Sequence, residues 1–287
     1  MLQVARLAPK LLGESADLVA SFIRSQFSQD GGFVDREGRA DFYYTVFGIE
    51  AMLALQLEPP REALRAFLRR GVAGKLDFVH LCSLARAAAG VGGEGFSTAE
   101  NAGIVAQLQT YRTPDGGYHG TTGRFCGSAY GALLAHGAHR DLGVALDEPH
   151  RLLTSVLALQ LTDGSFANEP GIALGSTTAT GAAVTLCRHM DHHLGSATGE
   201  WILSQLHSSG GFLATPQAPL PDLLSTAVAL HALDGLETPY THVREACLDF
   251  VDSLWSAQGG FHGHWADDHL DCEYTYYGLL ALGHLAL

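Results

Sequence analysis

The tetrapeptide Asp30-Gly31-Gly32-Phe33 is the first of five related phrases that divide the chain. The other four are Asp115-Gly116-Gly117-Tyr118, Asp163-Gly164-Ser165-Phe166, Ser209-Gly210-Gly211-Phe212 and Gln258-Gly259-Gly260-Phe261. From Gly116 onward the phrases recur roughly every 46 to 49 residues, a period typical of helical arrays and rings. The longer interval between Gly31 and Gly116 accommodates two shorter units, the second of which has residues 71–75 in place of the double glycine. The sequence therefore predicts six repeated units.

Each unit contains two segments of helical periodicity, one before and one after the glycine phrase. The first segment is amphipathic, over residues 16–27, 61–70, 99–109, 150–160, 197–206 and 242–256. The second is apolar around most of its circumference, over residues 42–55, 78–89, 127–135, 177–186, 223–233 and 272–284. A helix that is apolar on most sides must be buried on most sides. We therefore expect the second helix of each pair to lie inside the first.

These pairs predict an all-α fold, an α/α toroid in which six helical hairpins surround a central cavity. An open solenoid is the alternative, but its ends would need polar caps. The last unit instead finishes in Leu279-Leu280-Ala281-Leu282, which favours a closed ring. No linker or change of composition divides the chain, so we expect one domain over residues 1–287. Its repeats are expected at about 16–55, 60–90, 98–137, 147–188, 196–234 and 242–285.

Composition and charge exclude several classes of partner. Apolar residues make up 47% of the chain and charged residues 16%, which is too apolar for a disordered protein. The net charge of −13 disfavours binding to nucleic acid and electrostatic docking on anionic lipid. Five scattered cysteines without a Cys-x-x-Cys pair favour a reducing compartment, so we expect a cytoplasmic protein. No run of about 18 apolar residues occurs, so we expect no membrane span.

Two stretches carry a resemblance to a known superfamily. In the first, Gly31-Gly32-Phe33 is followed by Asp35 and then by Asp41-Phe42-Tyr43-Tyr44-Thr45. In the second, Ser209-Gly210-Gly211-Phe212 is followed by Leu220-Pro221-Asp222. The chain resembles the β-subunits of protein prenyltransferases and the related squalene and terpene cyclases over about residues 16–285. The resemblance implies an α/α toroid whose inner cavity binds an isoprenoid.

The resemblance also implies a zinc ion, which the β-subunits hold with an Asp, a Cys two residues later and a His in the sixth unit. The matching positions here are Asp222, Leu224 and Tyr274, so one ligand of three is retained. The family's diphosphate-binding cations are also missing, because residues 172–175 and 215–219 contain no Arg, Lys or His. Spare cations that could form a different diphosphate site are Arg39, Lys75 and Arg124.

The cyclase motif is incomplete in a similar way. Those enzymes protonate an alkene with the middle Asp of an Asp-x-Asp-Asp-Thr-Ala motif. The corresponding stretch is Asp222-Leu223-Leu224-Ser225-Thr226-Ala227, in which the middle position is a leucine. Asp222 is then the catalytic candidate that remains.

A relocated metal site would use Asp222 with Cys272 and Glu273, which lie at the start of the last inner helix. The alternative role for Asp222 is helix capping. Four aspartates directly precede inner helices, where a capping side chain is worth about 1 kcal/mol; they are Asp41, Asp77, Asp222 and Asp271. We therefore predict no cofactor, with zinc as the alternative.

Recognition of a ligand is expected at the cavity wall. Several large side chains stand three or four positions apart on the apolar inner helices, so that some of them face inward together. Aromatic rings bury area against an apolar chain and offer π-faces to a developing carbocation. The candidate substrate-binding residues are Tyr44, Phe47, His80, Tyr130, Tyr274 and Tyr277. The alternative is that they fill the core between the two layers.

The function expected is that of a prenyltransferase-like or terpene-cyclase-like toroid. It would bind an isoprenoid or similar apolar chain, and transfer or rearrange it without the family's intact zinc site. One alternative is a non-catalytic binding protein for a lipid or a lipidated peptide, and another is a carbohydrate-active helical barrel. Prenyltransferase β-subunits work with a partner subunit, so the resemblance also allows a helical partner subunit for this chain.

Overall fold

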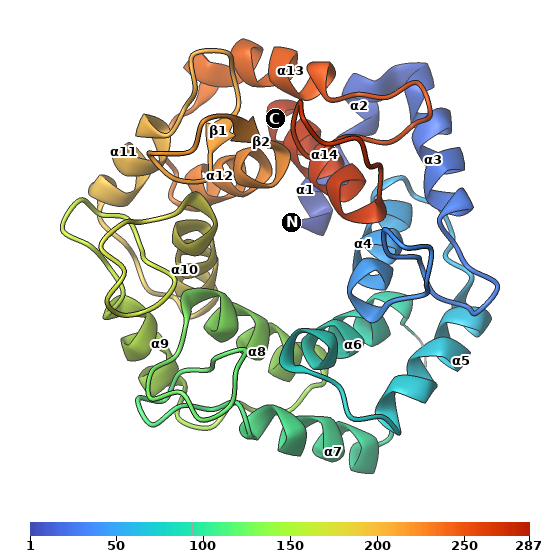
Figure 1. Cartoon of the computed structure of the whole chain (residues 1–287), viewed down its shortest axis with the longest axis vertical. Helices are drawn as coiled ribbons and strands as arrows, with labels where there is room; N and C mark the ends of the chain where they lie inside the picture. Colours follow the sequence, from blue (N-terminus) through green and yellow to red (C-terminus); the bar gives the residue numbers. More distant parts are fainter. Residues whose placement is uncertain (93–94) are drawn as a thin grey trace.

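The computed structural model describes residues 1–92 and 95–287. Within this part of the chain, twelve helices form two concentric layers around an open centre (Figure 1). The inner layer consists of α4 (Phe42–Ala54), α6 (Phe78–Val91), α8 (Ala129–Asp141), α10 (Thr177–His189), α12 (Leu223–Gly235) and α14 (Cys272–Leu285). The outer layer consists of α3 (Ala16–Ser25), α5 (Arg61–Val72), α7 (Thr98–Gln109), α9 (Pro149–Leu157), α11 (Ser196–Ser204) and α13 (Arg244–Ser253). The predicted all-α toroid is confirmed.

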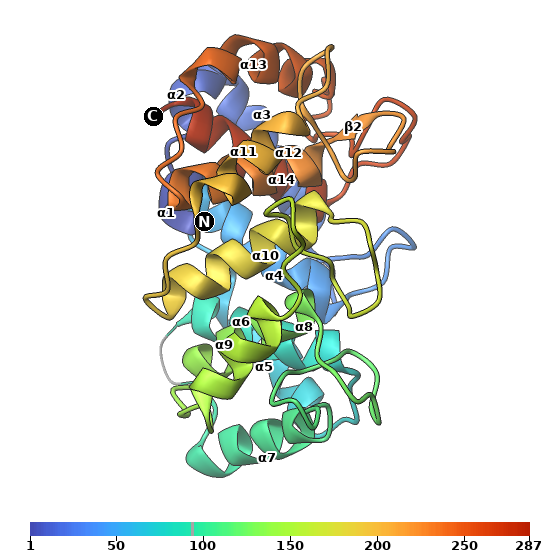
Figure 2. The same ribbon diagram turned by 90° about the vertical axis from the view of Figure 1, so that its left-hand side faces the viewer.

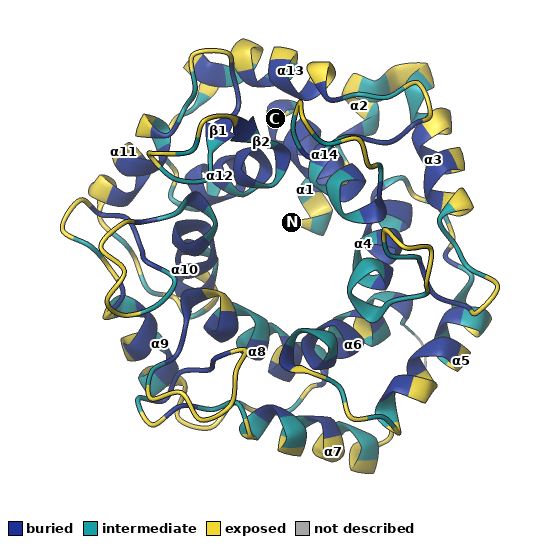
Figure 3. Ribbon diagram, in the orientation of Figure 1, coloured by how far each residue is buried: buried dark blue, intermediate teal, exposed yellow. Residues whose placement is uncertain are grey.

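Short elements complete the fold. They are α1 (Leu2–Ala5), α2 (Pro9–Leu12), the 3₁₀ turns η1 (Gly13–Ser15) and η2 (Thr241–Val243), and the antiparallel pair β1 (Phe212–Leu213) and β2 (Pro221–Asp222). The loops after the glycine phrases all project from one face of the ring, and α1 lies at the opposite face (Figure 2). The outer helices expose their outward sides and bury the sides that face the inner layer (Figure 3). None of the described helices combines the length and the apolar character that crossing a bilayer requires.

A side-chain cap fixes the start of every inner helix. In each case an Asp or Ser accepts a hydrogen bond from the backbone N–H three residues later, which satisfies a donor that the helix itself leaves free. The caps are Asp41, Asp77, Ser128, Ser176, Asp222 and Asp271. The helix α8 begins two residues after its predicted start at residue 127. The reason is that the Asp115 carboxylate accepts the Gly127 N–H (3.0 Å) and holds this glycine outside the helix.

A buried threonine ties the inner helix to the glycine phrase of the same unit. The Thr45 Oγ1 accepts the backbone N–H of Phe33 at 2.9 Å, and the Thr226 Oγ1 accepts that of Phe212 at the same distance. The equivalent bonds run from Phe166 to Thr180 and from Phe261 to Thr275. All these threonines and aromatic residues are buried. The aromatic ring is thereby held beneath its inner helix.

The first glycine of each phrase contacts the outer helix of the next unit. Gly210 has a φ of +82°, and a Cβ there would lie 2.1 Å from the carbonyl oxygen of Ala246 in α13. Gly259, in the last unit, has a φ of +94°, and a Cβ there would lie 2.2 Å from the carbonyl oxygen of Leu18 in α3. The contact that joins successive units therefore also joins the last unit to the first.

Other contacts close the ring at the same junction. The helix α14 packs against α12 on one side and α4 on the other. The Arg36 guanidinium, in the loop before α4, forms ion pairs with Asp271 (2.8 Å) and Asp267 (3.0 Å) of the last unit. The ring is thus closed by backbone packing and by charge.

We predict that Thr226→Val lowers the free energy of unfolding by roughly 1–3 kcal/mol, because the Phe212 N–H would remain buried without an acceptor. Urea denaturation followed by circular dichroism measures the change. The control is Thr154→Val, at an exposed position whose hydroxyl bonds only to the His150 carbonyl of the same helix. It should change the free energy by less than about 0.5 kcal/mol. Equal losses in the two variants would contradict the role of the buried hydroxyl.

We also predict that Gly259→Ala lowers the free energy of unfolding by about 3 kcal/mol or more, because strain at positive φ adds to a backbone clash with Leu18. The matched control is Gly38→Ala, where φ is +78° but no atom lies within 4 Å of the new Cβ. This control should lose only the strain, about 1–2 kcal/mol. If both variants unfold at the same urea concentration, the glycine contact does not close the ring.

Candidate functional site

A cavity of about 430 Å³ opens at the N-terminal ends of α4, α6 and α8. The N-terminal ends of these inner helices lie on the face from which the loops project (Figure 2). The lining combines aromatic rings with carboxylates, and its residues are Asp35, Glu37, Asp41, Tyr43, Tyr44, Val79, His80 and Tyr130. The cavity can therefore offer apolar surface to a ligand beneath a mouth that carries acidic groups.

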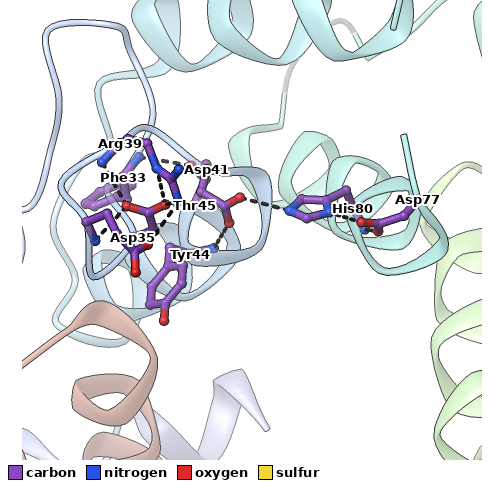
Figure 4. Close-up of polar contacts among 9 residues, drawn as sticks. Phe33, Asp35, Arg39, Asp41, Tyr44, Thr45, Asp77 and His80 are labelled. Atoms are coloured by element: carbon purple, nitrogen blue, oxygen red, sulfur yellow. Dashed lines mark hydrogen bonds and ion pairs between the residues drawn. The ribbon is translucent and has the colours of Figure 1, made fainter. Parts of the chain in front are cut away.

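At the mouth, His80 bridges two of the capping aspartates (Figure 4). Its Nε2 lies 2.9 Å from Asp41 Oδ2, and its Nδ1 lies 2.8 Å from Asp77 Oδ2. The hydrogen bond with Asp41 and that with Asp77 raise the pKa of His80 to about 9, although burial opposes the shift. At neutral pH the imidazolium donates from both nitrogens. His80 therefore clamps α6 to the start of α4 and has no ring nitrogen left for a ligand.

A wall of aromatic rings joins α4 to α14. The Phe47 ring lies 4.9 Å from that of Tyr43 and 5.5 Å from that of Tyr277, measured between ring centroids. Tyr130, on α8, is 43% exposed and lines the same cavity as Tyr43. Aromatic rings of this kind carry a large apolar area, and the tyrosines among them add hydroxyl groups.

Glu273 is placed against this wall. Its Oε1 accepts a hydrogen bond of 2.5 Å from the Tyr43 hydroxyl. Burial raises the pKa of Glu273 to about 7, with a further contribution from the Asp271 carboxylate, while the Tyr43 hydrogen bond opposes the shift. Close to neutral pH a large fraction of Glu273 is protonated. A carboxyl group in this state can donate a proton as well as accept one.

The structure separates the sequence-predicted cavity residues into three groups. Tyr44, His80 and Tyr130 line the cavity. Phe47 and Tyr277 belong to the aromatic wall. Tyr274 lies under Arg36, whose guanidinium carbon is 5.5 Å from the ring centroid. It therefore belongs to the junction that closes the ring.

The sequence alone does not predict the pairing of Tyr43 with Glu273. The spacing of four between Tyr43 and Phe47 was the available signal, because residues four apart share one face of a helix. The sequence pattern instead indicates Tyr44, which is three residues from Phe47. No sequence signal connects Tyr43 to Glu273, because the two lie 230 residues apart.

The predicted metal ligands do not fit a zinc site. Asp222 caps α12, and its two carboxylate oxygens accept the Ser225 N–H and the Ser225 hydroxyl, both at 2.7 Å. Cys272 is fully buried, and burial raises the pKa of its thiol well above the usual value. Glu273 bonds to Tyr43. Among the described residues, no three His, Cys, Asp or Glu side chains come together as a metal site would require.

The arginines proposed for a relocated diphosphate site already have acidic partners. Arg39 pairs with Asp35 at 2.8 Å and with Glu37 at 3.0 Å. Arg124 pairs with Glu169 at 2.7 Å. A diphosphate bound by these residues would have to displace carboxylates from them.

Several solved protein structures are similar to this one over most of the chain. The type II terpene cyclase MstE from Scytonema, in complex with geranylgeranyl dihydroxybenzoate, is similar at 13% identity with a TM-score of 0.66, and 97% of each chain is covered. A protein from Actinoplanes is similar at 15% identity with a TM-score of 0.70, over 96% of this chain and 99% of that one. The ent-copalyl diphosphate synthase from Streptomyces platensis is similar at 17% identity with a TM-score of 0.52, over 85% of this chain and 50% of that one.

At these identities the solved structures show a shared fold and nothing more. No curated protein sequence matches the chain. The model of the prenyltransferase alpha-alpha toroid domain matches residues 10–69 and 178–286, which is more than half of the chain. The two matched ranges contain all four of the buried threonines described above, Thr45, Thr180, Thr226 and Thr275. The chain therefore belongs to the prenyltransferase alpha-alpha toroid domain family.

Proposed function

We propose that the protein binds an isoprenoid or a similar elongated apolar chain in its central cavity. The observation that carries this proposal is the aromatic wall of Tyr43, Phe47 and Tyr277 beside a cavity that Tyr130 also lines. Burying an apolar chain against such a surface yields about 25 cal/mol per Å². The similar cyclase from Scytonema holds a geranylgeranyl compound, which supports the same class of ligand here.

The polar end of this ligand is uncharged. Asp35, Glu37 and Asp41 line the mouth, and Arg39 is already paired with two of them. A diphosphate needs unpaired cations, particularly in a protein with a net charge of −13. An alcohol or an aromatic ester requires no such compensation.

Glu273 supports a catalytic step on the bound chain. In this step the protonated carboxyl transfers its proton to an alkene carbon or an epoxide oxygen of the chain, and Glu273 becomes a carboxylate. The cation that forms lies beside the faces of Phe47 and Tyr277, which stabilise positive charge. Ring closure by the chain's own π-bonds and loss of a proton to the carboxylate would restore Glu273. The proposed reaction is thus a proton-initiated rearrangement without a metal.

The alternative is a binding protein for a lipid or a lipidated peptide that performs no reaction. The replacement of the family's acidic position by Leu224 favours it. The two functions share the cavity and differ only in the role of Glu273. Binding and catalysis are therefore tested separately.

For binding, we predict that geranylgeraniol binds more tightly than geranylgeranyl diphosphate, because the acidic mouth repels the diphosphate. Isothermal titration calorimetry measures both. Phe47→Ala should weaken binding of the alcohol about tenfold, as expected for loss of an aromatic contact. Leu18→Ala, at an exposed position on α3, is the control and should bind like the unaltered protein. Tighter binding of the diphosphate would overturn the proposed ligand class.

For catalysis, we predict that turnover of a geranylgeranyl ester or alcohol falls as the pH rises through about 7, because the reaction requires protonated Glu273. Glu273→Gln should abolish turnover while binding persists. Tyr43→Phe removes a hydrogen bond that stabilises the carboxylate, so the pKa of Glu273 should rise and the fall in activity should move to higher pH. Nuclear magnetic resonance of the Glu273 carboxyl carbon gives the pKa independently of turnover. Full activity in Glu273→Gln would leave only the binding function.

A further inference from the structure

Exposed apolar side chains gather on the face of the ring where the cavity opens. Phe125 is 83% exposed, Ile172 46%, Leu220 39% and Leu174 36%. They lie in the loops over residues 119–128, 167–176 and 213–221, which lead into α8, α10 and α12. Figure 2 shows these loops, in green, yellow and orange, projecting to the same side. Phe125, Ile172, Leu174 and Leu220 are here named the apolar rim.

The three loops that carry the apolar rim are almost without charge. Their only charged side chains are Arg124 and Glu169, which pair with each other at 2.7 Å. The loop over residues 213–221 contains no charged residue at all. In contrast, the loops over residues 34–41 and 262–271, on the other half of this face, contain six Asp and Glu side chains against two arginines, Arg36 and Arg39, which leaves them with a net negative charge. One half of the mouth is therefore apolar and uncharged, and the other is acidic.

Packing inside the molecule does not account for the apolar rim. Trp265, in the last loop, is also 43% exposed. However, its Nε1 donates a hydrogen bond to Ser253 Oγ (2.8 Å), and its ring lies 5.5 Å from that of Phe250. Phe125 is almost twice as exposed and has no aromatic neighbour within the described chain. Exposing four large apolar side chains on adjacent loops is costly unless another apolar surface covers them.

We propose that the apolar rim inserts into the surface of an uncharged, zwitterionic lipid bilayer. The charge distribution supports this partner, because a protein of net charge −13 is repelled by anionic lipid. Its uncharged half-face instead suits a surface without net charge. Insertion of apolar side chains at an interface requires no membrane span. The bilayer would then cover the loops beside the cavity mouth, so that an apolar chain could pass from lipid to cavity with little contact with water.

Vesicle flotation without any ligand tests this proposal, so its failure is distinguishable from failure of the proposed function. The unaltered protein should float with phosphatidylcholine vesicles, and added phosphatidylserine should not strengthen binding. The triple variant Phe125→Ser, Ile172→Ser and Leu174→Ser should lower the partition coefficient at least about tenfold. The control variant Leu11→Ser and Leu18→Ser removes two leucines from the outer surface that are 39% and 46% exposed, close to the values for Leu174 and Ile172, and should lower it less than about twofold. Circular dichroism checks that both variants fold.

Three outcomes would overturn the proposal. The first is that the unaltered protein does not float with phosphatidylcholine vesicles. The second is that the rim variant and the control variant lose binding equally, which would indicate non-specific adsorption. The third is a concentration-dependent dimer, measured by light scattering, that the rim variant abolishes while flotation is unchanged. In that case the apolar rim would be an interface between two copies of this chain.

Discussion

A buried threonine hydroxyl fixes each helix pair to its turn in four of the six units of the described chain. Both partners of this hydrogen bond are shielded from water, so the aromatic N–H has no other acceptor if the hydroxyl is removed. The bond holds the aromatic residue beneath its own inner helix. The glycine two residues earlier is thereby held against the next outer helix, as Gly210 is against α13. One local bond thus sets the geometry within a unit and between units.

The repetition of this constraint explains why the architecture could be predicted. The glycine phrase, the cap and the apolar helix recur in a fixed order, so each unit supported the interpretation of the others. The prediction was least accurate where the third unit departs from the pattern. There Ala132 stands where the other units have the threonine, and Asp115 accepts the N–H groups of Gly117 and Gly127. A side chain twelve residues away thereby moved the start of α8, and the helical pattern alone contains no sign of it.

The chemistry of the site depends on contacts between distant residues, which single-sequence reasoning cannot supply. The pKa values of three histidines illustrate this dependence. Two carboxylates from neighbouring helices raise the pKa of His80 to about 9. Near the C-terminal ends of α12 and α14, burial lowers the pKa of His231 to about 2 and that of His284 to about 3. A hydrogen bond of 3.0 Å joins the two imidazoles. The same residue type is therefore charged at the mouth and neutral at the far end. Position on an inner helix predicted neither state.

The same reasoning distinguishes the acid that the family motif indicates from the acid that the structure offers. Asp222 occupies the first position of the motif, two residues before the missing acid, and capping engages both of its oxygens with Ser225. A carboxylate committed in this way loses part of the helix cap if it takes up a proton. Glu273 lies one position inside the neighbouring helix α14 and is engaged through Oε1 alone. Burial raises the pKa of both carboxyl groups, but only Asp222 has both of its oxygens engaged in a helix cap. In the absence of an acid at Leu224, Glu273 beside the aromatic wall is therefore the carboxyl group on which the proposed proton transfer depends.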